Sequence, residues 1–240
     1  MSGIMEILHK KKISTISDLA SAMGVSVSTI RRDIEKLVEN ELVLCKKNSV
    51  VPISELSSDL SIAFRSNINA AAKNAIAREA VKLIKDNSTI IMDSSSTALC
   101  MTEHLFYRHN LTIITNSIAA VEKLRGSKNK LILIGGKFSE RSYAFIGEMA
   151  EECIKNYNYD MSFISSVAIT KLGYAAETVA GAAAIRRIIF SHSAKNVLLC
   201  DSSKMQIERS FNIAHIDEFD YIITNDKVYP QNTRAQVIRV

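Results

Sequence analysis

Four short polar runs have the residue types of an anion-binding site, and each follows a run of apolar residues. They carry hydroxyls, an amide, small residues and lysines: Asp93-Ser94-Ser95-Ser96-Thr97, Thr115-Asn116-Ser117, Gly135-Gly136-Lys137 and Asp201-Ser202-Ser203-Lys204. Hydroxyls and unpaired backbone N–H groups at the start of a helix bind phosphate well, and Lys204 would add a full charge. Taken singly, each run could instead cap a helix through its Ser or Asp side chain.

The residues around these runs predict an α/β domain with a largely parallel sheet. Short apolar strands are predicted at 89–92, 111–114, 131–134, 163–169, 197–200 and 221–223, and amphipathic helices at 71–85, 99–107, 118–124, 148–156 and 180–192. Strands that alternate with helices favour a buried parallel sheet. Because ligands bind beyond the carboxyl ends of the strands in such a sheet, we expect the four polar runs to converge on one crevice.

A second group of residues suited to binding lies on one face of a helix predicted over residues 26–37. Its apolar face is formed by Ile30, Ile34, Leu37 and Val38. The candidate DNA-contacting residues on its other faces are Ser28, Thr29, Arg31, Arg32 and Lys36. Arginine forms forked contacts with guanine edges or phosphates, and small hydroxyls contact phosphate oxygens, so this face suits the major groove of DNA. A plain solvated charged face is the alternative.

The segments on either side of this helix favour DNA binding. Thr15-Ile16-Ser17-Asp18 has the form of a capping box, and Gly24 is placed to end the helix that it begins. The short turn that follows has the spacing of a helix-turn-helix. Residues 41–51 predict a two-stranded wing with Lys46 and Lys47 at its tip, where they could meet phosphates. A simple connecting hairpin is the alternative.

Composition narrows the class of protein. The chain has 240 residues, a formal net charge of +5 and four cysteines. This mild positive charge permits a polyanionic partner without demanding one. The cysteines are far apart and form no CxxC pair, so we predict no metal, no cofactor and no disulfide framework. No apolar run approaches the roughly 18 residues that a membrane span needs, and we expect a cytoplasmic protein without a membrane partner.

The motifs together resemble the DeoR-type bacterial transcriptional regulators. Ser17-Asp18-Leu19-Ala20 and the run from Val25 to Ile34, with its Ser-x-x-Thr-Ile-Arg-Arg-Asp string, resemble the winged helix of that family. The four polar runs resemble loops of the family's effector half. The chain differs from the usual pattern at the wing, at Ser95 in place of glycine, at Ser165 in place of glycine, and at Ala182 in place of glutamate.

The resemblance implies an N-terminal winged helix-turn-helix domain, mainly α, at residues 1–51, a linker at 52–70, and a C-terminal α/β domain at 71–240. The second domain would be related in fold to sugar-phosphate isomerases and would bind a phosphorylated sugar. The predicted effector-binding residues are Asp93, Ser94, Ser95, Ser96, Thr97, Thr115, Asn116, Ser117, Gly135, Gly136, Asp160, Glu177, Arg186 and Lys204. The implied protein is a homo-oligomer, dimer or tetramer, that binds operator DNA and represses carbohydrate-metabolism genes.

Two alternatives remain open from the sequence. The first is a sugar-phosphate isomerase with a fused helix-turn-helix, for which Asp160 or Glu177 would be the base. No Ser-His-Asp or Cys-His grouping stands out, and we predict no catalytic residue. The second is a DNA-binding scaffold whose effector pocket has decayed, a hypothesis that Ser95 and Ala182 motivate.

Overall fold

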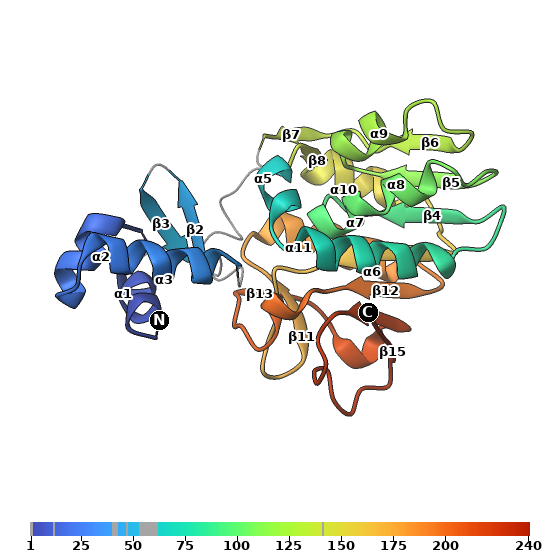
Figure 1. Cartoon of the computed structure of the whole chain (residues 1–240). Coiled ribbons are helices and arrows are strands. Elements are labelled where there is room, and N and C mark those ends of the chain that lie inside the picture. The colour runs from blue at the N-terminus through green and yellow to red at the C-terminus, as the bar shows by residue number, and fades with distance from the viewer. Residues whose placement is uncertain (1, 12, 40–42, 47, 53–61, 141) are drawn as a thin grey trace. The chain divides into compact units, whose positions relative to one another are not determined.

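The computed structural model describes residues 2–11, 13–39, 43–46, 48–52, 62–140 and 142–240. The chain divides into two compact units, 1–60 and 61–240 (Figure 1). The predicted linker at 52–70 falls across this division, and its residues 53–61 lie outside the described residues. The second unit begins before residue 71, because α5 (Ile62–Asn67) already packs within it.

The first unit is a helix-turn-helix with a three-stranded antiparallel sheet. Its elements are α1 (Ser2–Lys11), β1 (Ser14–Thr15), α2 (Ile16–Met23), α3 (Val27–Glu39), β2 (Val43–Lys46) and β3 (Ser49–Pro52). The sheet has the order β1-β3-β2, and β2 and β3 form the predicted wing. A core that includes Ile4, Leu19 and Ile30 holds the helices against the sheet.

The predicted start and end of α2 are confirmed. The Asp18 amide donates to Thr15 Oγ1 over 3.0 Å, and the Thr15 amide donates to Asp18 Oδ2 over 3.3 Å, which makes a complete capping box. Hydrogen bonding of the Asp18 carboxylate to the Thr15 hydroxyl, and next to the Thr15 amide, lowers the pKa of Asp18. Gly24 ends the helix with φ +64°, a left-handed conformation that glycine adopts without strain.

Removing this cap should weaken the first unit. We expect Thr15→Ala to lower the free energy of unfolding by about 1 kcal/mol, because a helix amide loses its acceptor. Urea unfolding followed by circular dichroism at 222 nm measures the change. Thr15→Ser keeps the hydroxyl and should remain close to wild type, whereas equal stability of Thr15→Ala and wild type would contradict the assigned role.

One residue of the predicted apolar face of α3 is misplaced. Ile30, Ile34 and Leu37 are buried as predicted, but Val38 is 41% exposed. At 100° per residue Val38 lies about 80° from Ile30, at the edge of the apolar stripe. The core therefore holds α3 through a narrower face than the sequence indicated.

The second unit is built on a seven-stranded sheet in which every pairing is parallel. Its strands, in spatial order, are β15 (Gln236–Arg239), β14 (Tyr221–Thr224), β12 (Asn196–Leu199), β9 (Met161–Ser165), β4 (Thr89–Met92), β5 (Thr112–Thr115) and β6 (Lys130–Leu133). The sequence predicted six of these strands and missed β15. The predicted strand 163–169 is split, because its last residues join a different sheet.

Two smaller sheets accompany the main one. The first has the antiparallel order β10-β11-β13 and contains β10 (Ala168–Ile169), β11 (Tyr174–Glu177) and β13 (Phe211–His215). The second is a hairpin of β7 (Lys137–Ser139) and β8 (Ala144–Ile146). Two 3₁₀ turns, η1 (Ser202–Lys204) and η2 (Ile216–Glu218), lie beside strand ends.

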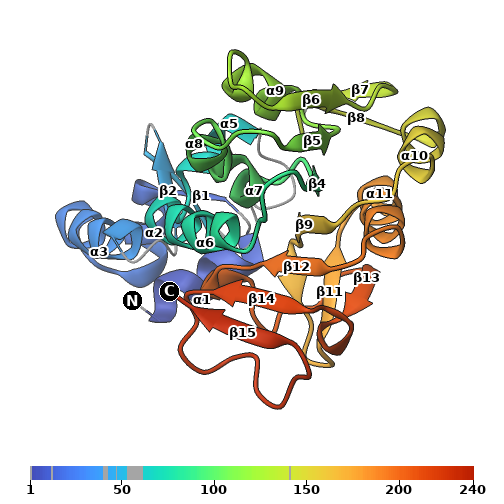
Figure 2. The same ribbon diagram turned by 90° about the vertical axis from the view of Figure 1, so that its right-hand side faces the viewer.

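Helices cover both faces of the main sheet (Figure 2). They are α6 (Ala70–Lys82), α7 (Ser96–Cys100), α8 (Thr102–Leu105), α9 (Ile118–Leu124), α10 (Glu148–Lys155) and α11 (Ala180–Ser191), in addition to α5. Ile90 and Met92 belong to a core with α6, while Ile91 belongs to a second core with α10 and α11. This alternation arises because successive strand residues point to opposite faces of a sheet.

The direction of strand addition reverses between β4 and β9. From β4 the chain adds β5 and β6 on one side, then crosses to add β9, β12, β14 and β15 on the other. The carboxyl ends of β4 and β9 therefore flank a topological switch point, the usual position of a ligand crevice in an open α/β sheet.

Candidate effector site and DNA-binding helix

A buried ion-pair cluster joins the two strands at the switch point. Asp93, directly after β4, accepts hydrogen bonds through Oδ2 from the Ser165 amide at 3.0 Å and from Arg186 Nε at 2.7 Å. Its Oδ1 accepts from the Ser95 amide at 3.0 Å. Arg186 Nη1 also lies 3.0 Å from Glu177 Oε1. The loops after β4 and β9 are thereby tied to α11 and β11.

This cluster changes the role assigned to three predicted effector-binding residues. Asp93, Glu177 and Arg186 are buried and bind one another. Burial alone would lower the pKa of Arg186, but the carboxylates of Glu177 and Asp93 outweigh this effect and raise it. Arg186 is therefore charged and held in place, and its bonds to Asp93 and Glu177 tie α11 to the carboxyl ends of β4 and β11.

Lys204 supplies a cation beside the switch point. Its Nζ donates to Ser165 Oγ over 2.9 Å and lies 3.7 Å from Asp201 Oδ2, and its side chain is 18% exposed. Ser165 Oγ in turn donates to the Leu199 carbonyl over 2.6 Å. Ser165, which stands where the family usually has glycine, therefore helps to hold the ammonium group at the end of β9.

Several hydroxyls and carboxylates of the polar runs cap helices. Ser95 Oγ accepts from the Ala98 amide at the start of α7, and Ser117 Oγ accepts from the Ala120 amide at the start of α9. Asp201 accepts in the same way from the Ser203 amide of η1. Burial alone would raise the pKa of Asp201, but Lys204 and its hydrogen-bond partners keep it below the usual value. The capping alternative thus applies to individual residues of three runs.

Several buried polar atoms near the carboxyl ends of the strands have no hydrogen-bond partner within the described part of the chain. They include Thr97 Oγ1, Asn116 Oδ1 and Ser166 Oγ, which follow β4, β5 and β9, and Asn69 Oδ1, beside Asp201. An unpaired buried polar atom costs roughly 1–3 kcal/mol. Ser166 was absent from the predicted set.

The remaining predicted effector-binding residues have local structural roles or open space around them. Thr115 Oγ1 accepts from the Ser117 amide, while Ser94 and Ser96 lie beside Ser95 in the loop that begins α7. Gly135 and Gly136 follow β6. A Cβ on Gly136 would lie 2.9 Å from both the Ala150 Cβ and the Ile146 carbonyl oxygen. This glycine is therefore required for packing, whereas Gly135 has open space around it.

Asp160 does not belong to the crevice, so its assignment to the effector site is wrong. It precedes β9, is exposed, and accepts a 2.7 Å hydrogen bond from the Thr89 amide at the start of β4. Asp160 precedes β9, so it lies at the amino end of this strand. Because the strands are parallel, the four polar runs, which follow the strands, lie at the opposite ends. Glu177, the other candidate base, is paired with Arg186.

Lys73 is a buried charge that the sequence analysis missed. It is 4% exposed, and its Nζ donates to the carbonyls of Arg65 and Ile68 over 2.5 and 2.6 Å. Burial lowers its pKa to about 8, and the nearby Lys204 adds to this effect. The helical spacing could have predicted its burial, because Lys73 shares the apolar face of α6 with Ile76, Ala77 and Ala80.

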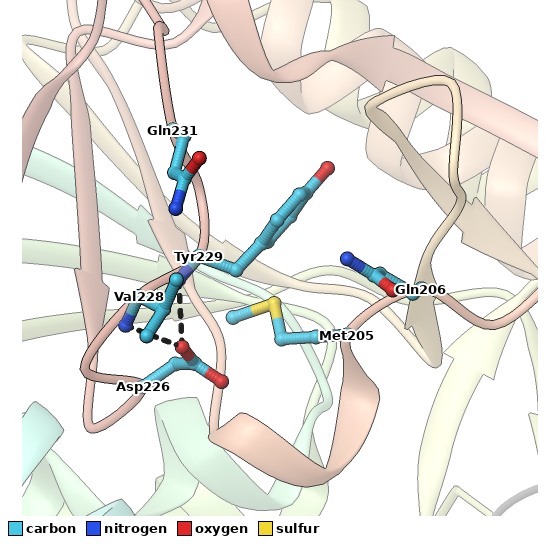
Figure 3. Close-up of a pocket in the computed structure, with 6 residues that line it drawn as sticks. All are labelled: Met205, Gln206, Asp226, Val228, Tyr229 and Gln231. Carbon is cyan, nitrogen blue, oxygen red and sulfur yellow. Dashed lines mark hydrogen bonds between the residues drawn. The ribbon is translucent and has the colours of Figure 1, made fainter.

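A pocket of about 500 Å³ lies beyond the carboxyl ends of β12 and β14. Figure 3 shows the six residues that line it: Met205, Gln206, Asp226, Val228, Tyr229 and Gln231. Asp226 Oδ1 accepts from the amides of Val228 and Tyr229 over 2.9 and 2.7 Å, which shapes one wall. These six lining residues include no Lys or Arg.

The predicted DNA-contacting side chains of α3 are accessible. Ser28, Thr29, Arg31, Arg32 and Lys36 are all exposed. The Thr29 amide donates to Ser26 Oγ over 3.2 Å, which caps the first turn of α3. Lys46 belongs to β2, where its backbone pairs with Ser49, and Lys47 lies outside the described residues.

Among the described residues, the helices include none with the length and apolar composition of a membrane span.

Known proteins match both units. The DeoR-like helix-turn-helix domain family matches residues 1–54, and the DeoR C terminal sensor domain family matches residues 68–226. The L-fucose operon activator of Haemophilus influenzae is 30% identical over 95% of this chain and 92% of its own. The lactose phosphotransferase system repressor of Staphylococcus aureus is 26% identical over 100% of this chain and 95% of its own.

A solved structure resembles part of the chain. Ribose 5-phosphate isomerase A from Methanocaldococcus jannaschii aligns with a TM-score of 0.43 and 21% identity over 57% of this chain and 55% of its own. The family matches are far more extensive, since the sensor family alone spans residues 68–226. The resemblance found in the motifs is confirmed, and the chain belongs to the DeoR family of helix-turn-helix transcriptional regulators.

Proposed function

We propose that the second unit of this regulator binds a phosphorylated sugar at the β4–β9 switch point and that this binding changes the affinity of α3 for operator DNA. The observation that carries the proposal is the position of Lys204, a partly exposed cation held between Ser165 and Asp201. Phosphate favours a site with a cation and hydroxyl donors. The buried unpaired atoms of Thr97, Asn116 and Ser166 suit the hydroxyls of a sugar.

The proposed regulator represses carbohydrate-metabolism genes as a homo-oligomer. A single recognition helix contacts few base pairs, so a symmetric dimer or tetramer on repeated half-sites would raise both affinity and specificity. The names of the relatives, a lactose phosphotransferase system repressor and an L-fucose operon activator, support sugar-linked control. Repression is proposed because two of the relatives, the lactose phosphotransferase system repressor and the transcriptional repressor AccR, are named repressors.

Thermal shift measurements test the effector. The full chain is mixed with glucose 6-phosphate, fructose 1-phosphate, fructose 6-phosphate, ribose 5-phosphate and each parent sugar. We expect at least one sugar phosphate to raise the melting temperature while its parent sugar does not, since ligand binding stabilises the folded state by mass action.

Fluorescence anisotropy on the DNA that flanks the chain's own gene then tests whether the sugar phosphate changes DNA affinity. Absence of any specific DNA complex at moderate salt would rule out the proposed regulation at that DNA.

Lys204→Ala should separate effector binding from DNA binding. Loss of a charge-assisted hydrogen bond removes about 1.5–3 kcal/mol, or roughly 10- to 150-fold in affinity for the sugar phosphate. The variant should still form the specific DNA complex, and its DNA affinity should no longer respond to the sugar phosphate, because that compound is no longer bound. Calorimetric titration measures the first quantity and anisotropy the second. Lys171→Ala, an exposed lysine on another loop, is the control. Unchanged sugar-phosphate affinity in Lys204→Ala would remove Lys204 from the site.

A further inference from the structure

Helix α5 is the first described element of the second unit, and it touches the elements that follow two of the polar runs. Ile62 of α5 is buried in one cluster with Leu99 of α7 and Ala120 of α9. α7 begins in the Ser94–Thr97 loop, and α9 begins after Ser117. A displacement of either loop is therefore passed to α5 through packed apolar side chains.

Asn69 ties the other end of α5 to the loop that carries Lys204. It lies between α5 and α6, is 6% exposed, and adopts a left-handed backbone with φ +53°. Its Nδ2 donates to Asp201 Oδ1 and to Ser203 Oγ, both over 2.9 Å. Asparagine tolerates this backbone better than most residues, so the side chain and the turn suit each other.

Lys73, on α6, also binds the carboxyl end of α5. Its ammonium group donates to the carbonyls of Arg65, in the last turn of α5, and of Ile68, directly after this helix, and the Arg65 carbonyl also accepts from the Ile68 amide. The charges of Lys204 and Asp201 both act on Lys73, with opposite signs. The end of α5 is therefore held by one side chain bonded to Asp201 and by another within the electrostatic influence of Asp201 and Lys204.

We propose that Asn69 and Lys73 are positioning residues that transmit occupancy of the Lys204 site to α5. An anion bound to Lys204 weakens the attraction between Lys204 and the buried Asp201 carboxylate, which then relaxes toward other partners. Asn69 moves with Asp201, and α5 moves with Asn69. This inference rests on the proposed function for the nature of the anion. It assumes no contact between the two units: α5 is the first described element after β3 of the DNA-binding unit, and residues 53–61 lie outside the described residues.

The coupling is tested first without any effector. Hydrogen–deuterium exchange is measured on the full chain for the amides of residues 62–68, with the amides of β5 as the reference for global unfolding. We expect Lys204→Ala to accelerate exchange in 62–68 at least about threefold relative to the reference, a local opening and not a global one. In an Asn69→Gly background, which keeps the left-handed backbone but deletes the side chain, the acceleration should vanish.

Asn87→Gly is the matched background for this comparison. Asn87 has φ +62°, is exposed, and lies in the turn after α6. Lys204→Ala should accelerate exchange of residues 62–68 in this background as it does in wild type. If Lys204→Ala leaves the exchange rate of residues 62–68 unchanged in the wild-type background, the proposed coupling is wrong, whatever ligand the site binds.

The effector arm uses the sugar phosphate that gives the largest thermal shift with wild type. We expect this compound to change wild-type DNA affinity at least about fivefold, the lower end of usual allosteric couplings. Asn69→Gly and Lys73→Met should bind the same compound but change DNA affinity less than about twofold, well below that range. Variants that respond like wild type would overturn the proposal. If no compound shifts wild type, the proposed effector class fails, while the exchange experiment still decides the coupling.

Discussion

Arg186→Ala should cause the largest loss of stability of any substitution discussed for the second unit. The variant leaves the buried carboxylates of Asp93 and Glu177 without their shared cation. Breaking a buried ion pair from one side costs about 3–5 kcal/mol. For a unit of this size the expected fall in melting temperature is about 6–20 °C, measured by differential scanning calorimetry.

Two further variants show whether the lost charge is the cause. Arg186→Met combined with Asp93→Asn and Glu177→Gln removes all three charges and should recover at least half of the loss, because no unpaired charge stays buried. Arg78→Ala, at an exposed position of α6, should leave the melting temperature unchanged. A loss below about 1 kcal/mol in Arg186→Ala would mean that water or another group compensates the carboxylates.

Arg32→Ala should produce the largest loss of DNA affinity from a single change. Arg32 is exposed on α3 while Ile30 and Ile34 hold the helix in the core. Loss of a base-edge contact costs about 1–3 kcal/mol, which is roughly 5- to 150-fold in the dissociation constant. Fluorescence anisotropy on the DNA that flanks the chain's own gene measures this value at several salt concentrations.

The salt dependence distinguishes the two kinds of contact that Arg32 can make. If it binds a phosphate, the slope of log affinity against log salt should fall by about 1, and all DNA sequences should lose affinity alike. If it binds a base edge, specific DNA should lose more than random DNA. Thermal unfolding should be the same as for wild type. A fall in melting temperature together with the lost affinity would instead make Arg32 a structural residue.

Local patterns in the sequence were sufficient for most of the elements. The capping box at Thr15 and Asp18 and the turn at Gly24 were predicted correctly, because each depends on neighbours within a few residues. The parallel sheet followed from apolar strands alternating with amphipathic helices. β15 was missed, since Gln236–Arg239 is a short edge strand with polar ends and is only partly buried.

The candidate site was only partly predictable, because its chemistry depends on pairs that are distant in sequence. Asp93 and Arg186 are 93 residues apart, and whether they bind a ligand or each other is decided when α11 packs on the sheet. The resemblance assigned Asp160 to the effector site. The strand direction puts it at the other edge instead.

The sequence by itself determined the family, the two-part organisation and the recognition helix, because those depend on short motifs and on helical and strand periodicity. The tertiary structure alone decided which polar residues remain available. It paired Arg186 with two carboxylates, left Lys204 partly exposed beside Ser165, and brought Asn69 to Asp201 and Lys73 to the Arg65 carbonyl. The physical reason is that burial forces charged and polar groups to find partners, and only the packed fold supplies those partners.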